Sequence, residues 1–271
     1  MSRKETLTFP PTSIPPLTPY LPPLNKPKKP WVTLTYATSL DASLSLAPGV
    51  RTTLSGPHSK AMTHYLRTQH AAILVGVGTA MADDPALNSR LEGIISLDQQ
   101  PRPIILDPRG RWAFTAENKV FQLAARGEGK APFILVSREE EEEEEEEEAS
   151  ITTQQEQEKI LQSVGGKYIP VEICSETRRF RWRDVLKALA EEELDSVMVE
   201  GGGEVINSLL VEPENQLVDS VIVTIAPTWL GQGGVVVSPT RKENAPQLKL
   251  REVSWQPHGE DVVLCGKISR T

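Results

Sequence analysis

Four short, almost uninterrupted apolar runs restrict the fold of this chain more than any other feature of its sequence. A strand with one wet face alternates apolar and polar side chains, whereas a strand buried on both faces can be apolar throughout. The runs are therefore typical of a parallel sheet that helices cover on both sides. They occupy residues 71–77, 103–106, 133–136 and 196–199, and Val32 to Tyr36 predicts a fifth strand.

Helical patterns separate several of these strands, and the end of the chain contains further strand patterns. The expected helices cover residues 58–69, 182–194 and 203–211, and the expected late strands cover residues 218–226 and 262–268, with only a loop between them. The first of these helices should begin near Pro57, because proline is favoured in the first helical turn. The chain is thus expected to be α/β, with some antiparallel pairing near its end.

Composition excludes several classes of protein. Hydrophobic residues make up 38% and charged residues 24% of the 271 residues, which is typical of a globular protein. No stretch approaches the roughly 18 apolar residues of a membrane helix, so no membrane association is expected. The two cysteines, Cys174 and Cys265, form no CxxC pattern, so we expect no metal site and reduced thiols in the cytoplasm.

The acidity of the chain comes from one tract. Residues 139–148 are ten consecutive glutamates, and without them the 37 acidic residues fall to 27, against 29 basic ones. The rest of the chain is therefore nearly neutral and does not resemble a nucleic-acid-binding surface. We expect an acidic loop insertion at about 138–158, which either binds a basic partner or is simply tolerated.

The first 30 residues contain nine of the 22 prolines. Proline disfavours helices and cannot donate a backbone hydrogen bond, so residues 1–30 predict a disordered arm that precedes a single domain over residues 31–271. The arm is either a plain leader or a ligand for a proline-recognising module. If the chain is an enzyme, deletion of residues 1–30 and of the glutamate run should leave turnover intact.

Two expected strands end in glycine-bearing turns. Glu200 is followed by Gly201, Gly202 and Gly203 and then by an expected helix, a pattern that lets a backbone approach a phosphate closely. It lacks the GxGxxG fingerprint and the Walker lysine, and such a turn is as often structural.

The second turn runs from Gly76 and Gly78 to Asp84 and Pro85, in which Thr79 can cap a short helix. Thr79 and Asp83 either bond a ligand or only shape the turn. Two such turns predict a cleft at the carboxyl edge of the sheet, where ligands bind in α/β folds.

Charged side chains near these turns are weaker candidates. Arg67 and Arg90 either clamp a phosphate or are solvated, and Asp41 is either an orienting carboxylate or a turn residue. His64 lies on the first expected helix, which we interpret as a surface helix.

Taken together, the segments resemble a known family, the fungal 2,5-diamino-6-ribosylamino-4(3H)-pyrimidinone 5′-phosphate reductases of riboflavin biosynthesis. These are related to the C-terminal reductase domain of bacterial RibD-type proteins. The segments that carry the resemblance are Ser39-Leu40-Asp41, Ser55-Gly56-Pro57 and residues 78–87, 101–107 and 199–203.

The resemblance implies a dihydrofolate-reductase-like three-layer fold, a homodimer and NADPH as the cofactor. It implies that the cofactor contacts Thr79, Asp83, Gly201, Gly202, Gly203, Glu204, Val205 and Ile206. It implies that the phosphorylated ribosylaminopyrimidine substrate contacts Arg67, Leu87, Arg90 and Glu200. The implied reaction is hydride transfer to C1′ of the ring-opened imine.

This sequence departs from the bacterial pattern in two places. Ala42 and Ser43 follow Asp41, so the lysine of the bacterial pattern is missing there, and Thr35 stands where bacterial relatives have lysine or asparagine. No proton donor is therefore assigned. Two alternatives remain open: a reductase of the same fold that acts on a pterin-like or folate-like substrate, and a non-catalytic interaction module.

Overall fold

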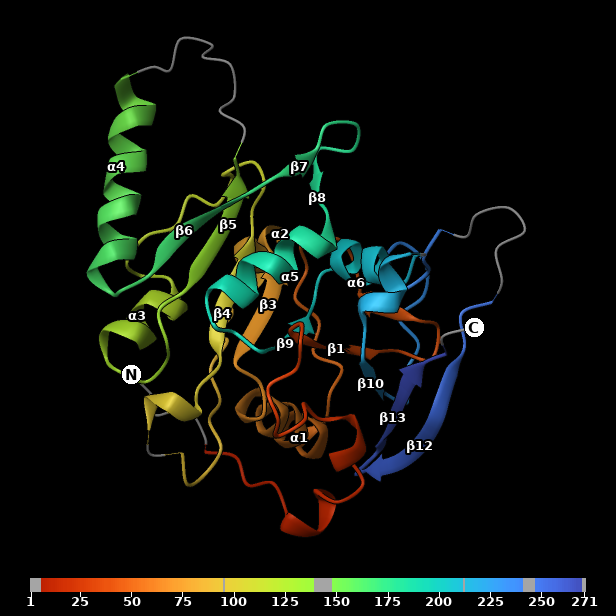
Figure 1. Ribbon diagram of the computed structural model, residues 1–271. Coiled ribbons are helices and arrows are strands. Elements are labelled where there is room, and N and C mark those ends of the chain that lie inside the picture. Colours follow the sequence, from red (N-terminus) through yellow and green to blue (C-terminus); the bar gives the residue numbers. More distant parts are fainter. Residues whose placement is uncertain (1–5, 95, 139–147, 212, 241–246, 270–271) are drawn as a thin grey trace.

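The computed structural model describes residues 6–94, 96–138, 148–211, 213–240 and 247–269 (Figure 1). Its centre is a nine-stranded sheet. The strands of this sheet are β1 (Trp31–Thr38), β3 (Ala72–Gly76), β4 (Arg102–Leu106), β5 (Phe133–Ser137), β6 (Lys167–Val171), β9 (Ser196–Glu200), β10 (Ser220–Ile225), β12 (Leu250–His258) and β13 (Asp261–Ile268). Two short ribbons accompany it, formed by β2 (Ser43–Ser45) with β11 (Val235–Val236) and by β7 (Ile173–Cys174) with β8 (Arg179–Phe180).

The sheet has the order β12-β13-β10-β1-β9-β3-β4-β5-β6. The seven strands from β10 to β6 are parallel to one another, and β13 runs antiparallel to both of its neighbours. The four apolar runs form β3, β4, β5 and β9 at the centre of this order, as the sequence predicts. Their continuous hydrophobicity follows from burial on both faces.

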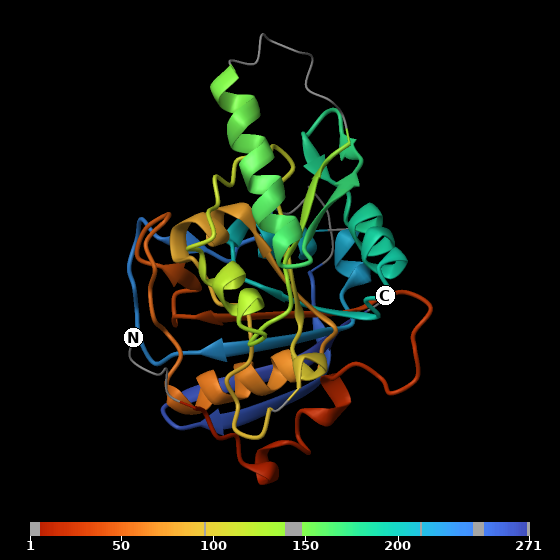
Figure 2. The same cartoon turned by 90° about the vertical axis from the view of Figure 1, so that its left-hand side faces the viewer.

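Helices cover both faces of the sheet, which gives the expected three layers (Figures 1 and 2). The helices are α1 (Pro57–Thr68), α2 (Val77–Asp83), α3 (Lys119–Ala125), α4 (Glu148–Ser163), α5 (Trp182–Glu191) and α6 (Gly203–Leu209). Short 3-10 turns occupy Pro11–Ser13, Thr18–Tyr20, Leu97–Gln99 and Glu214–Leu217.

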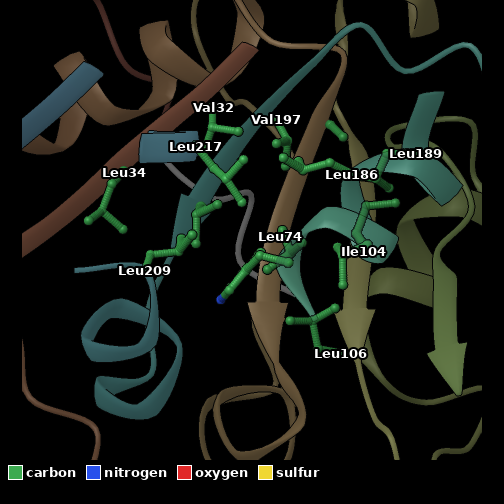
Figure 3. Packing of buried hydrophobic residues seen from close by; sticks show 14 of the residues in the cluster. Val32, Leu34, Leu74, Ile104, Leu106, Leu186, Leu189, Val197, Leu209 and Leu217 are labelled. Atoms are coloured by element: carbon green, nitrogen blue, oxygen red, sulfur yellow. The ribbon is translucent and has the colours of Figure 1, made fainter. Parts of the chain in front are cut away.

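The alternation of side chains along the strands separates the two faces. Leu74 and Val197 point to the face covered by α5 and α6, where Leu189 and Leu209 pack against them (Figure 3). Ile73 points to the opposite face, where α3 and α4 pack. Each fully buried aliphatic side chain of this kind contributes roughly 1.5–3 kcal/mol to the free energy of unfolding.

The end of the sheet differs from the expectation. The sequence predicts only a loop between residues 226 and 262, but β12 lies there and pairs with β13 as an antiparallel hairpin. β12 is an edge strand with exposed Arg251, Glu252 and Val253, so it lacks the apolar run that marks the central strands.

The N-terminal segment is ordered, so the prediction of a disordered arm is wrong for residues 6–30. Leu17 is fully buried and Tyr20 is 5% exposed, and both pack with Met62 and Leu66 of α1. In both ribbon views the segment passes beneath α1. Proline prevents repetitive backbone bonding here, but it does not prevent apolar side chains between the prolines from being buried.

The prediction of an acidic loop at about 138–158 is wrong for residues 148–158, which are helical. Residues 139–147 lie outside the described part of the chain, whereas α4 begins at Glu148 and includes residues 149–158. Glutamate and glutamine are good helix formers, and Leu161 anchors the end of this helix in the core. Within the described residues, no helix is long and apolar enough to cross a membrane.

Candidate active site

The two glycine-bearing turns lie side by side at the carboxyl edge of the sheet. β3 and β9 are parallel neighbours, with Leu74 opposite Val199, so the helices that follow them, α2 and α6, start next to each other (Figure 1). A Cβ on Gly76 would lie 2.9 Å from Val205 Cγ2, and a Cβ on Gly202 would lie 3.2 Å from Thr79 Oγ1. The structure therefore brings the two turns together as the sequence predicts.

Glycine is required in the turn after β9. Gly201 and Gly202 have φ angles of +72° and +76°, a region that side chains disfavour. Thr79 faces both of these glycines from within α2. The prediction that Thr79 caps this helix is wrong, because the helix begins at Val77 with Gly76 as its N-cap.

The backbone after Gly202 offers three hydrogen-bond donors. Gly203, Glu204 and Val205 occupy the first turn of α6, where helix geometry leaves the N–H groups without intrahelical partners. Ile206 differs, because its N–H donates to the Gly202 carbonyl at 3.0 Å and its side chain is fully buried. Ile206 is predicted to contact the cofactor, but its buried side chain and its hydrogen bond to Gly202 support the turn instead.

The two adjacent carboxylates at the end of α2 have different surroundings. Asp84 Oδ1 accepts hydrogen bonds from the Asn118 side chain at 3.1 Å and from the Lys119 N–H at 3.0 Å. Asp84 thereby joins α2 to α3. The half-buried Asp83 carboxylate forms no such bond with any described residue, so it is the carboxylate that a ligand can reach.

Arg67 and Glu200 form a two-pronged ion pair directly before the glycine turn. Arg67 donates from Nε to Glu200 Oε1 at 2.9 Å and from Nη2 to Oε2 at 2.7 Å. The side chains are 13% and 18% exposed. Arg67 Nη1 also donates to the Asn88 carbonyl at 2.9 Å. These bonds use three of the five N–H groups of the guanidinium and leave two for a ligand.

Arg90 is joined to the same helix through His64. The Arg90 N–H donates to His64 Nδ1 at 3.0 Å, and Arg90 Nη2 lies 3.3 Å from His64 Nε2. His64 is only 5% exposed, so it lies on the buried face of α1, whereas His58 of the same helix is exposed. The spacing of three residues between His64 and Arg67 is the signal in the sequence that places them on one face of α1.

Leu87 does not present its side chain to the cleft. It is 2% exposed and packs with Val75 and Val77 in the core. Its φ of +52° is unusual for leucine, so its backbone is the part that shapes the loop between Asp84 and Arg90.

The strand β11, which the sequence does not predict, covers the start of α6. β11 lies against it, and a Cβ on Gly203 would lie 2.4 Å from Val235 Cγ1. Asn207 donates from Nδ2 to the Val236 carbonyl at 3.0 Å. A hollow of 340 Å³ opens beside these residues. It is also lined by Arg179, Glu204, Ser208, Val211, Ser238 and Thr240.

Asp41 is a turn residue. Its carboxylate accepts hydrogen bonds from the Ser39 hydroxyl, from the Leu230 N–H at 3.2 Å and from the Gly231 N–H at 2.8 Å. The Ser39 bond, followed by these backbone donors, lowers the pKa of Asp41 below its usual value. Asp41 therefore fixes the loop after β10, and no proton-donating role follows from this arrangement.

Two sets of groups lie near the end of β9. Gly201, Gly202 and Thr79 meet at the glycine turns, and Arg67 pairs with Glu200 directly before them. Arg90 is joined to the helix of Arg67 through His64. Within the described residues, no group of His, Cys, Asp and Glu side chains is arranged to hold a metal ion.

Comparison with known proteins places the chain among reductases. Residues 30–264 match the model of the RibD C-terminal domain family. The 2,5-diamino-6-ribosylamino-4(3H)-pyrimidinone 5′-phosphate reductase of Eremothecium gossypii is 41% identical over 261 residues, which cover 93% of this chain and 95% of that protein. The protein of the same name from Saccharomyces cerevisiae is 40% identical, with coverage of 89% of this chain and 87% of that protein.

A solved structure shows the same arrangement of elements. The riboflavin biosynthesis reductase Rib7 of Saccharomyces cerevisiae superposes with a TM-score of 0.72 at 35% identity. The match covers 93% of this chain and 97% of that one.

Proposed function

Because this chain belongs to the RibD C-terminal domain family, we propose that it reduces 2,5-diamino-6-ribosylamino-4(3H)-pyrimidinone 5′-phosphate to the ribitylamino 5′-phosphate in riboflavin biosynthesis. The observation that carries this proposal is the near full-length match to fungal reductases of that name. The meeting of the two glycine turns beside a pair of arginines supports it, because it provides one place for a cofactor and one for a phosphorylated substrate.

The cofactor in this proposal is a nicotinamide nucleotide, specifically NADPH, which supplies a hydride for C1′ of the ring-opened imine. The cradle around Gly202 fits such a group. Its backbone approaches Thr79 so closely that a Cβ on Gly202 would lie 3.2 Å from Oγ1, so the turn depends on glycine at this position. The N–H groups of Gly203, Glu204 and Val205 would hold the phosphates, and Thr79 and Asp83 would bond the sugar or amide groups.

The substrate lies on the side of the two arginines in this proposal. Glu200 orients Arg67 through two hydrogen bonds, so the remaining N–H groups of the guanidinium keep a fixed direction towards an anion. Arg90 supplies a second positive charge from the neighbouring loop. Such fixed geometry places C1′ near the hydride donor, which is the main contribution that a protein makes to this kind of reaction.

The resemblance to the family also supports a homodimer in the cytoplasm as the working form of the enzyme. Size-exclusion chromatography with light scattering tests the dimer directly. A monomeric mass at working concentrations would contradict it.

The function is tested by mixing the purified protein with NADPH and freshly prepared ribosylaminopyrimidine phosphate. We expect a substrate-dependent loss of the NADPH absorbance and a product with the mass of the ribitylamino compound. Dihydrofolate serves as the control substrate and NADH as the control cofactor. Turnover of dihydrofolate in place of the pyrimidine would contradict the proposed substrate, and equal turnover with NADH would contradict the choice of NADPH.

A further inference from the structure

We propose that the segment of residues 7–21, here called the N-terminal strap, positions the substrate side of the cleft. The inference rests on the proposed function for the identity of the substrate, but the contacts that carry it belong to the fold alone. They join the strap to the loop of Arg90 and to α1, the helix that carries Arg67.

The first contact is a backbone bridge to the Arg90 loop. The Leu7 N–H donates to the Arg90 carbonyl at 3.0 Å, and the Glu92 N–H donates to the Leu7 carbonyl at 2.8 Å. The Thr8 hydroxyl adds a hydrogen bond to Glu92 Oε2 at 3.0 Å. The strap therefore fixes the backbone immediately at and after Arg90.

The second contact holds the outer face of α1. The ring of Phe9 stacks on Tyr65 of α1, with 5.0 Å between the ring centroids, and lies 6.2 Å from the ring of His258 on β12. Further along, Leu17 and Tyr20 are buried against the same helix. The Tyr20 hydroxyl donates to the Glu252 carbonyl of β12.

These contacts reach the two segments that carry the arginines, the loop of Arg90 and the helix of Arg67. Arg67 is tied to the Asn88 carbonyl, and His64 of the same helix is bonded to Arg90, so α1 and the loop of residues 88–92 form one unit. Among the described residues, the contacts of the strap given above go to the Arg90 loop, to α1 and to the sheet, and none goes to Thr79 or Gly202. We therefore expect its effect to fall on the substrate and not on the cofactor.

The sequence of the strap suits this task. Its prolines restrict the unfolded chain and lower the entropy that is lost when the segment docks. They also leave few unpaired N–H groups in a segment that forms no regular ladder.

The test compares Leu7→Pro with Leu24→Pro in the full chain. Leu7→Pro removes the N–H that bonds to Arg90, whereas Leu24 is fully exposed and lies beyond the strap. We expect Leu7→Pro to raise the substrate KM about fivefold, while kcat and the NADPH Kd stay within about twofold of the control. Phe9→Ala, which leaves the bridge intact and removes the ring on Tyr65, should raise KM in the same way.

The alternative outcomes are distinct. An unchanged KM in both folded variants would overturn the proposal, and so would a rise in the NADPH Kd equal to the rise in KM. Should the wild-type protein not turn over this substrate, the proposed function would fail separately. Hydrogen exchange at the Glu92 amide would then decide the role of the strap: faster exchange in Leu7→Pro than in Leu24→Pro supports it, and equal exchange contradicts it.

Discussion

At the scale of single residues, the structure separates neighbours that the sequence treats alike. Asp83 and Asp84 are adjacent carboxylates at the end of α2, but only Asp84 is bonded into the fold by Asn118 and Lys119. The difference depends on where α3 lies relative to α2. No local pattern in the sequence contains that information.

A first prediction uses this pair of residues. Asp83→Asn removes a carboxylate that accepts no hydrogen bond from any described residue, so we expect little change in melting temperature. We expect a higher NADPH Kd, because the proposed bond from the cofactor to this carboxylate is weakened. Asp84→Asn should lower the melting temperature and leave the NADPH Kd nearly unchanged, because it weakens the junction between α2 and α3 by about 1 kcal/mol. Fluorescence titration with NADPH and thermal melting measure both effects. Equal effects of the two variants on the Kd would contradict the assignment of Asp83.

A second prediction concerns the close approach at Gly202. In Gly202→Ala, the new methyl group meets Thr79 Oγ1 at 3.2 Å and the φ of +76° becomes strained. We expect about 1 kcal/mol of destabilisation and at least about a tenfold rise in the NADPH Kd.

Gly165→Ala is the matched control, because Gly165 has a φ of +80° with open space around it and lies far along the chain at the end of α4. It should show the same kind of backbone strain without loss of NADPH affinity. The assignment of the cradle fails if Gly202→Ala and Gly165→Ala bind NADPH equally well.

At the scale of elements, the apolar runs predict the central strands, because strands buried on both faces have continuous apolar sequences. Strands at or near the edge of the sheet have a weaker apolar pattern. β6 contains Pro170 and β12 contains charged residues, so neither has the pattern of a buried strand. The helix α4 is missed for a related reason, since its glutamine-rich start resembles a solvated loop more than a helix with a buried end.

His70 shows how an element is held in place by a group that the sequence leaves without a role. Its Nδ1 donates to the Leu66 carbonyl at the end of α1, and its Nε2 accepts from the Thr33 hydroxyl of β1, each at 2.7 Å. The bond from Thr33 requires the neutral ring, because only an unprotonated Nε2 can accept a hydrogen bond. Burial lowers the pKa of His70 from 6.5 to about 4.

A third prediction follows for the pH dependence of stability. Between pH 6.5 and about 4 the unfolded state binds a proton at His70 that the folded state does not bind, so the free energy of unfolding decreases as the pH falls. The full decrease from this group is about 3 kcal/mol. The free energy of unfolding is obtained from urea-unfolding curves measured at several pH values across this range. His70→Gln should make this free energy depend less on pH, whereas His58→Gln, an exchange of an exposed histidine on α1, should leave the dependence unchanged. Burial also lowers the pKa of His258, so a smaller slope should remain. A slope in His70→Gln equal to that of the wild-type protein would contradict this account.

At the scale of the whole molecule, the sequence predicts a parallel sheet covered by helices on both faces and the meeting of two glycine turns at its carboxyl edge. Both follow from the apolar runs and the glycines that end them. The prediction fails for the N-terminal segment. The burial of Leu17 and Tyr20 depends on a groove formed by α1, β10 and β13, elements that come much later in the chain.

A fourth prediction adds a cost in stability to the expectation that deletion of residues 1–30 leaves turnover intact. Deletion of residues 1–23 uncovers Met62 and Leu66 and should lower the melting temperature by several degrees, since each buried side chain lost contributes roughly 1.5–3 kcal/mol. Deletion of residues 1–5 alone provides the control. An unchanged melting temperature after the longer deletion would show that the segment does not stabilise the fold.

The central claim is that hydride passes from a nicotinamide, held at the two glycine turns, to C1′ of the substrate. The most direct test uses NADPH carrying deuterium at either face of nicotinamide C4, with the product analysed by mass spectrometry. We predict that one of the two labelled cofactors transfers its deuterium to C1′ of the ribityl chain, and that Gly202→Ala slows this transfer. A reduced product that carries no deuterium from either cofactor would contradict the account.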